Sequence, residues 1–273
     1  MIVLNGREYK LLLVDTNVIS EMIKNPSHEF RKFLEWTIPN KFIPSFSLFT
    51  ILEIRKAVNI YDKFLELFSI LPCVILKSHE QLFTDETLHY PNPKEINPIL
   101  VAFTGALAPE GKKLKDILDL AFSDTVNLNN EAMWNSSKSE VVDSIKDLVK
   151  NFPSEDGKYT SKRIREFIEI AGFSQIALKA PEFARSKVNL QEAISIDAFP
   201  SLKMMLFTAF YKFYVDSRIP RISDTFDLII FATIPYVDAI ISENHQVEVV
   251  KKIKTQDDFI GHVQALTLKH IRS

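Results

Sequence analysis

A chain of 273 residues, of which 46% are hydrophobic and 25% charged, has the composition of a folded globular protein and not of a disordered one. Lys and Arg total 33 against 35 Asp and Glu, and a net charge of −2 lacks the signature of a protein that binds nucleic acid by overall charge. Because Cys73 is the one cysteine, an internal disulfide and a cysteine-based metal site are excluded. The sequence has neither a long apolar stretch nor a signal-peptide pattern, which predicts a cytoplasmic protein with no membrane contact.

The segment LLLVDTNVISEM, residues 11–22, joins an apolar run to a helical pattern at Asp15. Such a run is typical of a buried strand in a parallel sheet, because both of its faces need apolar partners. Asp15 would then lie at the carboxyl end of the strand, where open α/β sheets bind ligands. The same residue could instead cap the helix that follows. This stretch alone leaves both roles open.

Strands and helices continue to alternate up to a proline-rich boundary. Short helices are expected at 18–24 and 28–36, and strands at 41–45 (KFIPS) and Cys73–Leu76. The sequence YPNP at 90–93 then interrupts the pattern. We place the end of the first α/β segment there, at residue 92.

Residues 45–68 predict one long helix, capped by Ser47. Glu53 falls on the apolar side of this helix. An ionised carboxylate in that position needs a metal ion, an arginine or a lysine as partner. Alternatively, Glu53 tilts toward solvent beside Arg55 and Lys56.

The middle of the chain, from about Ile96 to about Pro200, shows a helical pattern almost throughout. Four stretches carry it: ILVAFTGALA, KKLKDILDLAF, SEVVDSIKDLVKNF and SKRIREFIEIAGF. Their lysines and arginines are typical of solvated helix faces. We interpret residues 93–200 as a helical insertion between two α/β segments, 1–92 and 201–273.

The α/β pattern returns after an apolar helix at 201–213. A helix beginning at Ser223 or Asp224 runs to Phe231, and AIIS predicts a buried strand that is followed directly by Glu243. Asp224 and Asp227 share one face at the amino-terminal end of this helix. Asp224 could neighbour a metal site or cap the helix.

Acids contributed by distant segments would therefore converge at one sheet edge. Four or five carboxylates without cationic partners repel one another, and a hard divalent cation such as Mg²⁺ or Mn²⁺ relieves that repulsion. A metal held by carboxylates can activate water and stabilise charge on a phosphoryl group. Hydrolysis of a phosphodiester is the natural chemistry of such a site.

The same segments resemble the PIN domain, the fold of VapC-type toxin ribonucleases. LLLVDTNVISEM is similar to the opening strand of the family and its first acid, Asp15. Ser47-x-x-Thr50-x-x-Glu53 resembles its S-x-x-T-x-x-E helix, FDLIIFA resembles the helix that carries the third acid, Asp227, and AIISEN takes the place of the strand that ends in Thr and Asp. At this last strand the chain departs from the family: Ser242 replaces the Thr, and the fourth acid is either Glu243, which we favour, or lost at Asn244.

The resemblance implies a three-layer α/β/α fold with a parallel central sheet and a metal-dependent endoribonuclease. Asp15, Glu53, Asp227 and Glu243 would act as the catalytic metal ligands, assisted by Asp224. Hydrogen bonds from Thr16, Asn17 and Ser242 would hold the carboxylates. Arg218 and Arg221, just ahead of Asp224, are the best candidates for phosphate contacts, but the sequence favours a surface role for each.

The implied substrate is RNA, structured RNA or tRNA included, and the implied protein partners are a second copy of the chain and an antitoxin-like protein. Two other functions stay open. A PIN-like fold that has lost catalysis would be a protein- or RNA-binding module, which the doubtful fourth acid and the insertion favour. A Rossmann-like metal-dependent phosphatase is the other alternative, but haloacid dehalogenase-like enzymes usually carry D-x-D where this chain has Asp15-Thr16-Asn17.

Overall fold

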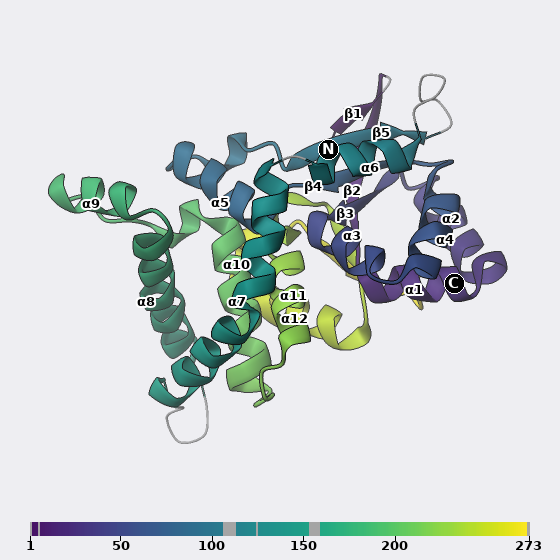
Figure 1. Cartoon of the computed structure of the whole chain (residues 1–273). Coiled ribbons are helices and arrows are strands. Elements are labelled where there is room, and N and C mark those ends of the chain that lie inside the picture. The colour runs from purple at the N-terminus through teal and green to yellow at the C-terminus, as the bar shows by residue number, and fades with distance from the viewer. Residues whose placement is uncertain (1, 5, 106–112, 124, 153–158, 272–273) are drawn as a thin grey trace.

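The computed structural model describes residues 2–4, 6–105, 113–123, 125–152 and 159–271, which form an α/β fold around a mostly parallel sheet (Figure 1). The strand order is β5-β4-β3-β2-β6-β7, and β1 pairs with β2 outside this path. The strands are β1 (Ile2–Leu4), β2 (Arg7–Val14), β3 (Phe42–Ser47), β4 (Pro72–Leu76), β5 (Ile99–Thr104), β6 (Ala239–Ile241) and β7 (Gln264–Leu266).

Helices connect and cover these strands. The α-helices are α1 (Thr16–Lys24), α2 (Arg31–Thr37), α3 (Leu48–Arg55), α4 (Val58–Phe68), α5 (His79–Leu88), α6 (Leu114–Ser123), α7 (Thr125–Asn151), α8 (Ser161–Lys179), α9 (Pro181–Asn189), α10 (Pro200–Ala209), α11 (Ile222–Phe231) and α12 (Asn244–Gln256). The described residues also include two π-helical turns, η1 (Pro26–Phe30) and η5 (Phe210–Val215), and four 3₁₀ turns, η2 (Pro93–Glu95), η4 (Ile196–Ala198), η6 (Ile234–Tyr236) and η7 (Asp258–Ile260). None of the helices in the described ranges has both the length and the apolar character needed to cross a membrane.

Strand β2 lies at the centre of the parallel part of the sheet, as the sequence predicted. It pairs in parallel with β3 on one side and with β6 on the other, so that Leu13 lies between Ser45 and Ile240. Residues Leu11–Val14 are fully buried, because helices cover both faces of the sheet at this point. The carboxyl ends of β2, β3, β4 and β6 therefore share one edge of the sheet.

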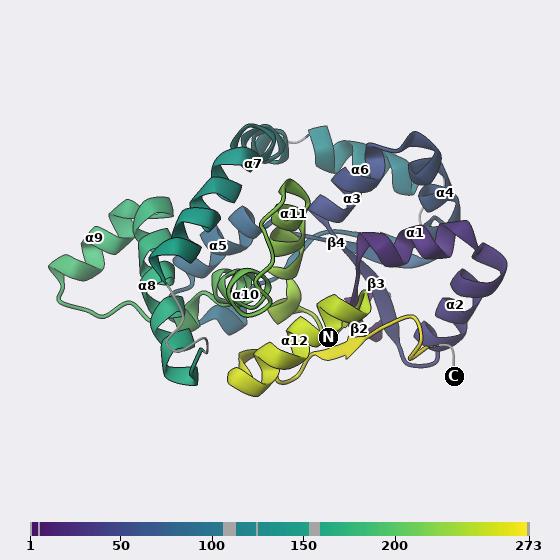
Figure 2. The same ribbon diagram turned by 90° about the horizontal axis from the view of Figure 1, so that it is seen from below.

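The helices form a layer on each face of the sheet. Figure 2 shows α1, α3 and α4 on one side of the strands and α12 on the other. The first three connect β2 to β3 and β3 to β4, which places them on the same face by the right-handed crossover rule. Helix α11 packs against α3 and also against α7, a helix of the middle segment.

Two expectations about secondary structure are wrong. The stretch ILVAFTGALA, expected to be helical, contains strand β5, which pairs antiparallel with β4; its last three residues, 106–108, lie outside the described part of the chain. A short apolar run fits a strand as well as a buried helix, and here an open sheet edge is beside it. The long helix expected at 45–68 is two helices, α3 and α4, because Ala57 takes an extended conformation between them.

The middle segment, residues 93–200, starts with η2 and β5 at the sheet and continues as helices α6–α9. Figure 1 shows α8 and α9 gathered on the side of the molecule opposite α2 and α4. Helix α8 packs against α10, and α7 packs against α11. These contacts bring the middle segment beside α10 and α11, two of the helices that follow it in the chain.

Candidate functional site

Asp15 is the residue at the carboxyl end of β2, and it also caps α1. Its side chain is 4% exposed. Oδ1 accepts a hydrogen bond from the backbone N–H of Thr16 at 2.8 Å, and Oδ2 accepts one from the Ser242 hydroxyl at 2.5 Å. Asp15 thus caps α1 while it lies at the carboxyl end of β2, and its role in ligand binding stays a prediction. The bond from Ser242, which follows β6, fixes the carboxylate between two neighbouring strands.

Burial raises the pKa of Asp15 to about 6. The hydrogen bond from Ser242 acts in the opposite direction, but the nearby carboxylates of Asp227 and Glu243 add to the rise. A carboxylate that is buried beside other carboxylates is a place where a cation would be stabilised. Among the described residues, no lysine or arginine forms an ion pair with Asp15.

Glu53, on α3, and Asp15 both accept a hydrogen bond from the same residue, Thr16. The Thr16 hydroxyl donates to Glu53 Oε2 at 2.6 Å, while the Thr16 backbone N–H donates to Asp15. Helix α3 begins where expected, because Ser47 accepts a hydrogen bond from the N–H of Phe49. Burial raises the pKa of Glu53, and Asp227 adds to this, while Lys56 partly offsets it. The Glu53 side chain is half-buried, so it is neither enclosed in the core nor fully exposed to solvent.

Asp227, on α11, is paired with a buried lysine. Lys212, on η5, is 0% exposed, and its Nζ donates to Asp227 Oδ2 at 2.6 Å. The same oxygen accepts a hydrogen bond from Gln246 Nε2 at 2.8 Å. The expectation that the carboxylates converge without a cationic partner is therefore wrong for Asp227. One ammonium group already neutralises part of the charge of the cluster.

Asp224, one turn before Asp227, is 1% exposed and engaged with three groups. Oδ2 accepts from the backbone N–H of Arg221 at 2.9 Å, Oδ1 lies 3.2 Å from Arg218 Nη2, and Lys212 Nζ lies 3.9 Å from Oδ1. Asp224 therefore stabilises the first turn of α11 and partners two cations. Arg218, expected to contact phosphate, is held by this carboxylate, whereas the Arg221 side chain is exposed.

Glu243 is the residue before the first turn of α12, and Asn244 is the first residue of the helix. Both are exposed, as is Asn17 on α1. These three residues and Ser242 line a cavity of about 460 Å³ on the surface at the sheet edge. Glu243 is near enough to influence the pKa of Asp15. A role for Glu243 as fourth acid stays a prediction.

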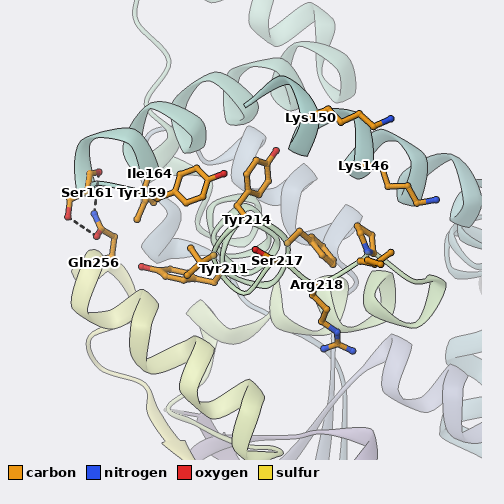
Figure 3. Close-up of a pocket in the computed structure, with 14 residues that line it drawn as sticks. Lys146, Lys150, Tyr159, Ser161, Ile164, Tyr211, Tyr214, Ser217, Arg218 and Gln256 are labelled. Atoms are coloured by element: carbon orange, nitrogen blue, oxygen red, sulfur yellow. Dashed lines mark hydrogen bonds between the residues drawn. The ribbon is translucent and has the colours of Figure 1, made fainter. Parts of the chain in front are cut away.

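A larger cavity, of about 1020 Å³, lies beside Arg218. Lys146 and Lys150 from α7 and three tyrosines, Tyr159, Tyr211 and Tyr214, are among the residues that line it. Figure 3 shows the Arg218 guanidinium extending away from Lys146 and Lys150. The three cations therefore do not gather at one point. Lys146 is also paired with Asp143 at 2.8 Å, which reduces the positive charge on this wall.

The donor set at the sheet edge fits a hard divalent cation. Asp15 and Glu53 offer carboxylate oxygens, each with only part of its lone-pair capacity used by the hydrogen bonds described above. Mg²⁺ is commonly held by one or two carboxylates and retains several waters. Within the described residues, no three His, Cys, Asp or Glu side chains form a group that could hold a metal ion. The fit thus rests on two carboxylates.

Two residues of this site were not found from the sequence. Lys212 interrupts the apolar run FTAFYKFYV, and a charged residue within such a run is a signal for a buried ion pair. Gln246 carries no comparable signal. Comparison of the chain with protein-family models, with curated proteins and with solved structures found no match.

Proposed function

We propose that this protein is a PIN-like, metal-dependent ribonuclease in which Asp15 and Glu53 hold Mg²⁺ or Mn²⁺. The observation that supports this most strongly is a pair of carboxylates, buried Asp15 and half-buried Glu53, which Thr16 joins at the carboxyl edge of the parallel sheet. The pKa of each is raised, and neither forms an ion pair with a lysine or arginine among the described residues. Perturbed carboxylates at this edge of an α/β sheet are typical of a functional site.

A bound metal would supply a water of lowered pKa and positive charge beside the phosphoryl group. The residues of the chain then have separate tasks. Ser242 and Thr16 orient the two carboxylates through the hydrogen bonds at 2.5 and 2.6 Å. Lys212 and Gln246 both donate to Asp227 Oδ2 and so hold this carboxylate in place. The exposed Arg221 is the candidate for contact with a substrate phosphate.

The direct test is hydrolysis of a fluorescently labelled RNA by the purified chain with Mn²⁺, with Mg²⁺, and with excess chelator. We expect cleavage that depends on metal and falls by about 100-fold in Asp15→Asn, because the amide cannot supply the negative charge that holds the cation. Glu35→Gln, an exposed substitution on α2, serves as the matched control and should cleave like the wild type. Cleavage by Asp15→Asn at the wild-type rate would overturn the assignment.

One observation favours a second candidate function. Asp227 matches the third acid of the PIN family, which would bind the metal. Its ion pair with Lys212 neutralises part of its charge without a metal. In a PIN-like module that binds RNA or protein without catalysis, Asp227 need not bind a metal, so its ion pair with Lys212 would not impair the function. This alternative predicts RNA binding that is indifferent to Asp15→Asn and no cleavage with either metal.

A further inference from the structure

Lys212 is a buried lysine that lies between two carboxylates of α11. Its side chain is 0% exposed, and its Nζ lies 2.6 Å from Asp227 Oδ2 and 3.9 Å from Asp224 Oδ1. Asp224 is itself 1% exposed, so little water reaches either charge. A charged group without water depends on opposite charges and hydrogen bonds nearby. The ammonium group of Lys212 is therefore a fixed positive charge beside two acids.

Asp227, the main partner of this lysine, lies near the two carboxylates that are proposed to hold the metal ion. It acts on the pKa of both Asp15 and Glu53, and its helix packs against α3, which carries Glu53. The Ser242 hydroxyl, just before α12, donates to Asp15 at 2.5 Å. Gln246, one turn later in the chain, donates to Asp227 at 2.8 Å. The lysine therefore belongs to the same charged cluster as the proposed metal ligands.

The oxygen of Asp227 that contacts Lys212 has no free lone pair for a metal ion. Asp227 Oδ2 accepts from Lys212 Nζ at 2.6 Å and from Gln246 Nε2 at 2.8 Å. A carboxylate oxygen has about two lone-pair sites, and these two donors use both. In sites with two metal ions the ions lie about 3.5–4 Å apart. A second ion that used this oxygen would have to displace the lysine.

The net charge of the cluster matches one divalent ion. We count the charged side chains that form ion pairs with one another here or that act on the pKa of Asp15 or Glu53. Five are negative and three are positive: Asp15, Glu53, Asp224, Asp227 and Glu243 against Lys56, Lys212 and Arg218. One Mg²⁺ or Mn²⁺ balances the two negative charges that remain. A second divalent ion would leave an excess of positive charge in a largely buried place.

We propose that Lys212 is a built-in cation of the candidate metal site: its ammonium group lies where a second metal ion would otherwise bind, and the chain holds one divalent ion, at Asp15 and Glu53. This inference rests on the proposed function, because it concerns the same site. Lys212 is a positioning residue, since it acts through Asp227. Its ion pair then has a role within a metal-dependent site.

The first test counts the Mn²⁺ ions that the purified wild-type chain binds at neutral pH, from the electron paramagnetic resonance signal of the ions left free in solution. We expect one tightly bound ion per chain. Two ions per chain would overturn the built-in cation and leave the proposed function in place. No bound ion would overturn the proposed metal site, and this inference with it.

Lys212→Met tests whether the lysine excludes a second ion. Without the ammonium group, Asp224 and Asp227 keep their negative charges one turn apart and lose the cation that they share. We therefore expect this variant to bind two Mn²⁺ ions per chain, because carboxylate oxygens are the preferred ligands of such ions. A lysine that only stabilises the fold predicts an unchanged count. One ion per chain in Lys212→Met would overturn the proposal.

Lys203→Met, on α10, is the matched control. Lys203 is also buried, at 5% exposed, and it is held by Asp197 at 2.6 Å and by Asp257 at 2.7 Å. Neither of these two acids is among the described residues that shift the pKa of Asp15 or Glu53. The count should stay at one ion in this control, because its unpaired acids lie outside the cluster. An equal gain of an ion in both variants would overturn the proposal.

Unfolding midpoints keep the proposal testable if Lys212→Met folds poorly. A metal ion that binds only the folded state raises the midpoint. We expect Mn²⁺ to raise the midpoint of Lys212→Met by more than that of the wild type, because the second ion replaces the missing positive charge. Lys203→Met should respond like the wild type. An equal rise in Lys212→Met and in the wild type would overturn the proposal.

Discussion

Substitution of Lys212 by methionine is expected to lower the free energy of unfolding by about 3–5 kcal/mol, the range typical of a buried ion pair that loses one partner. Lys212 is 0% exposed and donates to Asp227 at 2.6 Å. Its removal leaves Asp227 with Gln246 as its remaining described donor and takes a cation away from the buried Asp224. The methionine fills a similar volume, so the loss is mainly electrostatic.

Chemical denaturation at neutral pH measures this effect, and two further variants separate its causes. The double variant Lys212→Met with Asp227→Asn removes both charges and should regain much of the lost stability, because uncharged pairs bury at lower cost. Lys24→Met removes an exposed lysine paired with Glu21 and should have little effect. Wild-type stability in Lys212→Met would show that the buried pair does not contribute to the fold.

Stability is also expected to fall between about pH 4.5 and pH 7 because of Glu86, a buried residue of α5. Burial is the main cause that raises its pKa from 4.5 to about 7. The protonated form is therefore favoured in the folded state. The stability that Glu86 contributes is complete below the pKa it has in the unfolded chain, and it is lost as the pH rises through the pKa it has in the folded protein. The difference between the two pKa values corresponds to about 3 kcal/mol in the free energy of unfolding.

The surroundings of Glu86 allow a matched control. Oε1 accepts from the backbone N–H of Ser201 at 2.7 Å and from the Tyr236 hydroxyl at 2.6 Å, and Oε2 accepts from the Ser201 hydroxyl at 2.8 Å. A glutamine side chain can accept the two bonds to Oε1 through its amide oxygen and donate to the Ser201 hydroxyl through its amide nitrogen, but it cannot ionise. Glu86→Gln should therefore be more stable than the wild type above pH 7, and its stability should change less between pH 4.5 and pH 7. Parallel pH profiles of the two proteins, from denaturant unfolding, would contradict the assignment. In both proteins the raised pKa of Asp15 also makes the stability fall as the pH rises.

The sequence predicted the elements that position the site because each carries a strong local signal. The apolar run before Asp15 has the burial pattern of a central parallel strand, and Ser47 is a preferred N-cap residue. Thr16 and Ser242 were predicted to hold carboxylates by hydrogen bonds, and the Thr16 hydroxyl donates to Glu53 while the Ser242 hydroxyl donates to Asp15. The strand and cap signals depend on residues close in the chain, whereas the partners of these two hydroxyls lie far away in it.

Features that depend on distant segments could not be predicted in the same way. Strand β5 forms because β4 offers an unpaired edge, which the sequence ILVAFTGALA does not reveal. The pairing of Lys212 with Asp227 joins η5 to α11 and is fixed only by the packing of both elements. Glu86 did carry a signal, since it shares the spacing of the buried Leu82 and Phe83 along α5.

The most direct test of the metal assignment is calorimetric titration of Mn²⁺ into the wild type, Asp15→Asn, Glu53→Gln and the control Glu35→Gln at neutral pH. We predict saturable binding by the wild type and Glu35→Gln and at least about tenfold weaker binding by each of the other two, since each loses a charged ligand. Binding that is absent in the wild type, or equal in all four proteins, would contradict a metal site built on Asp15 and Glu53.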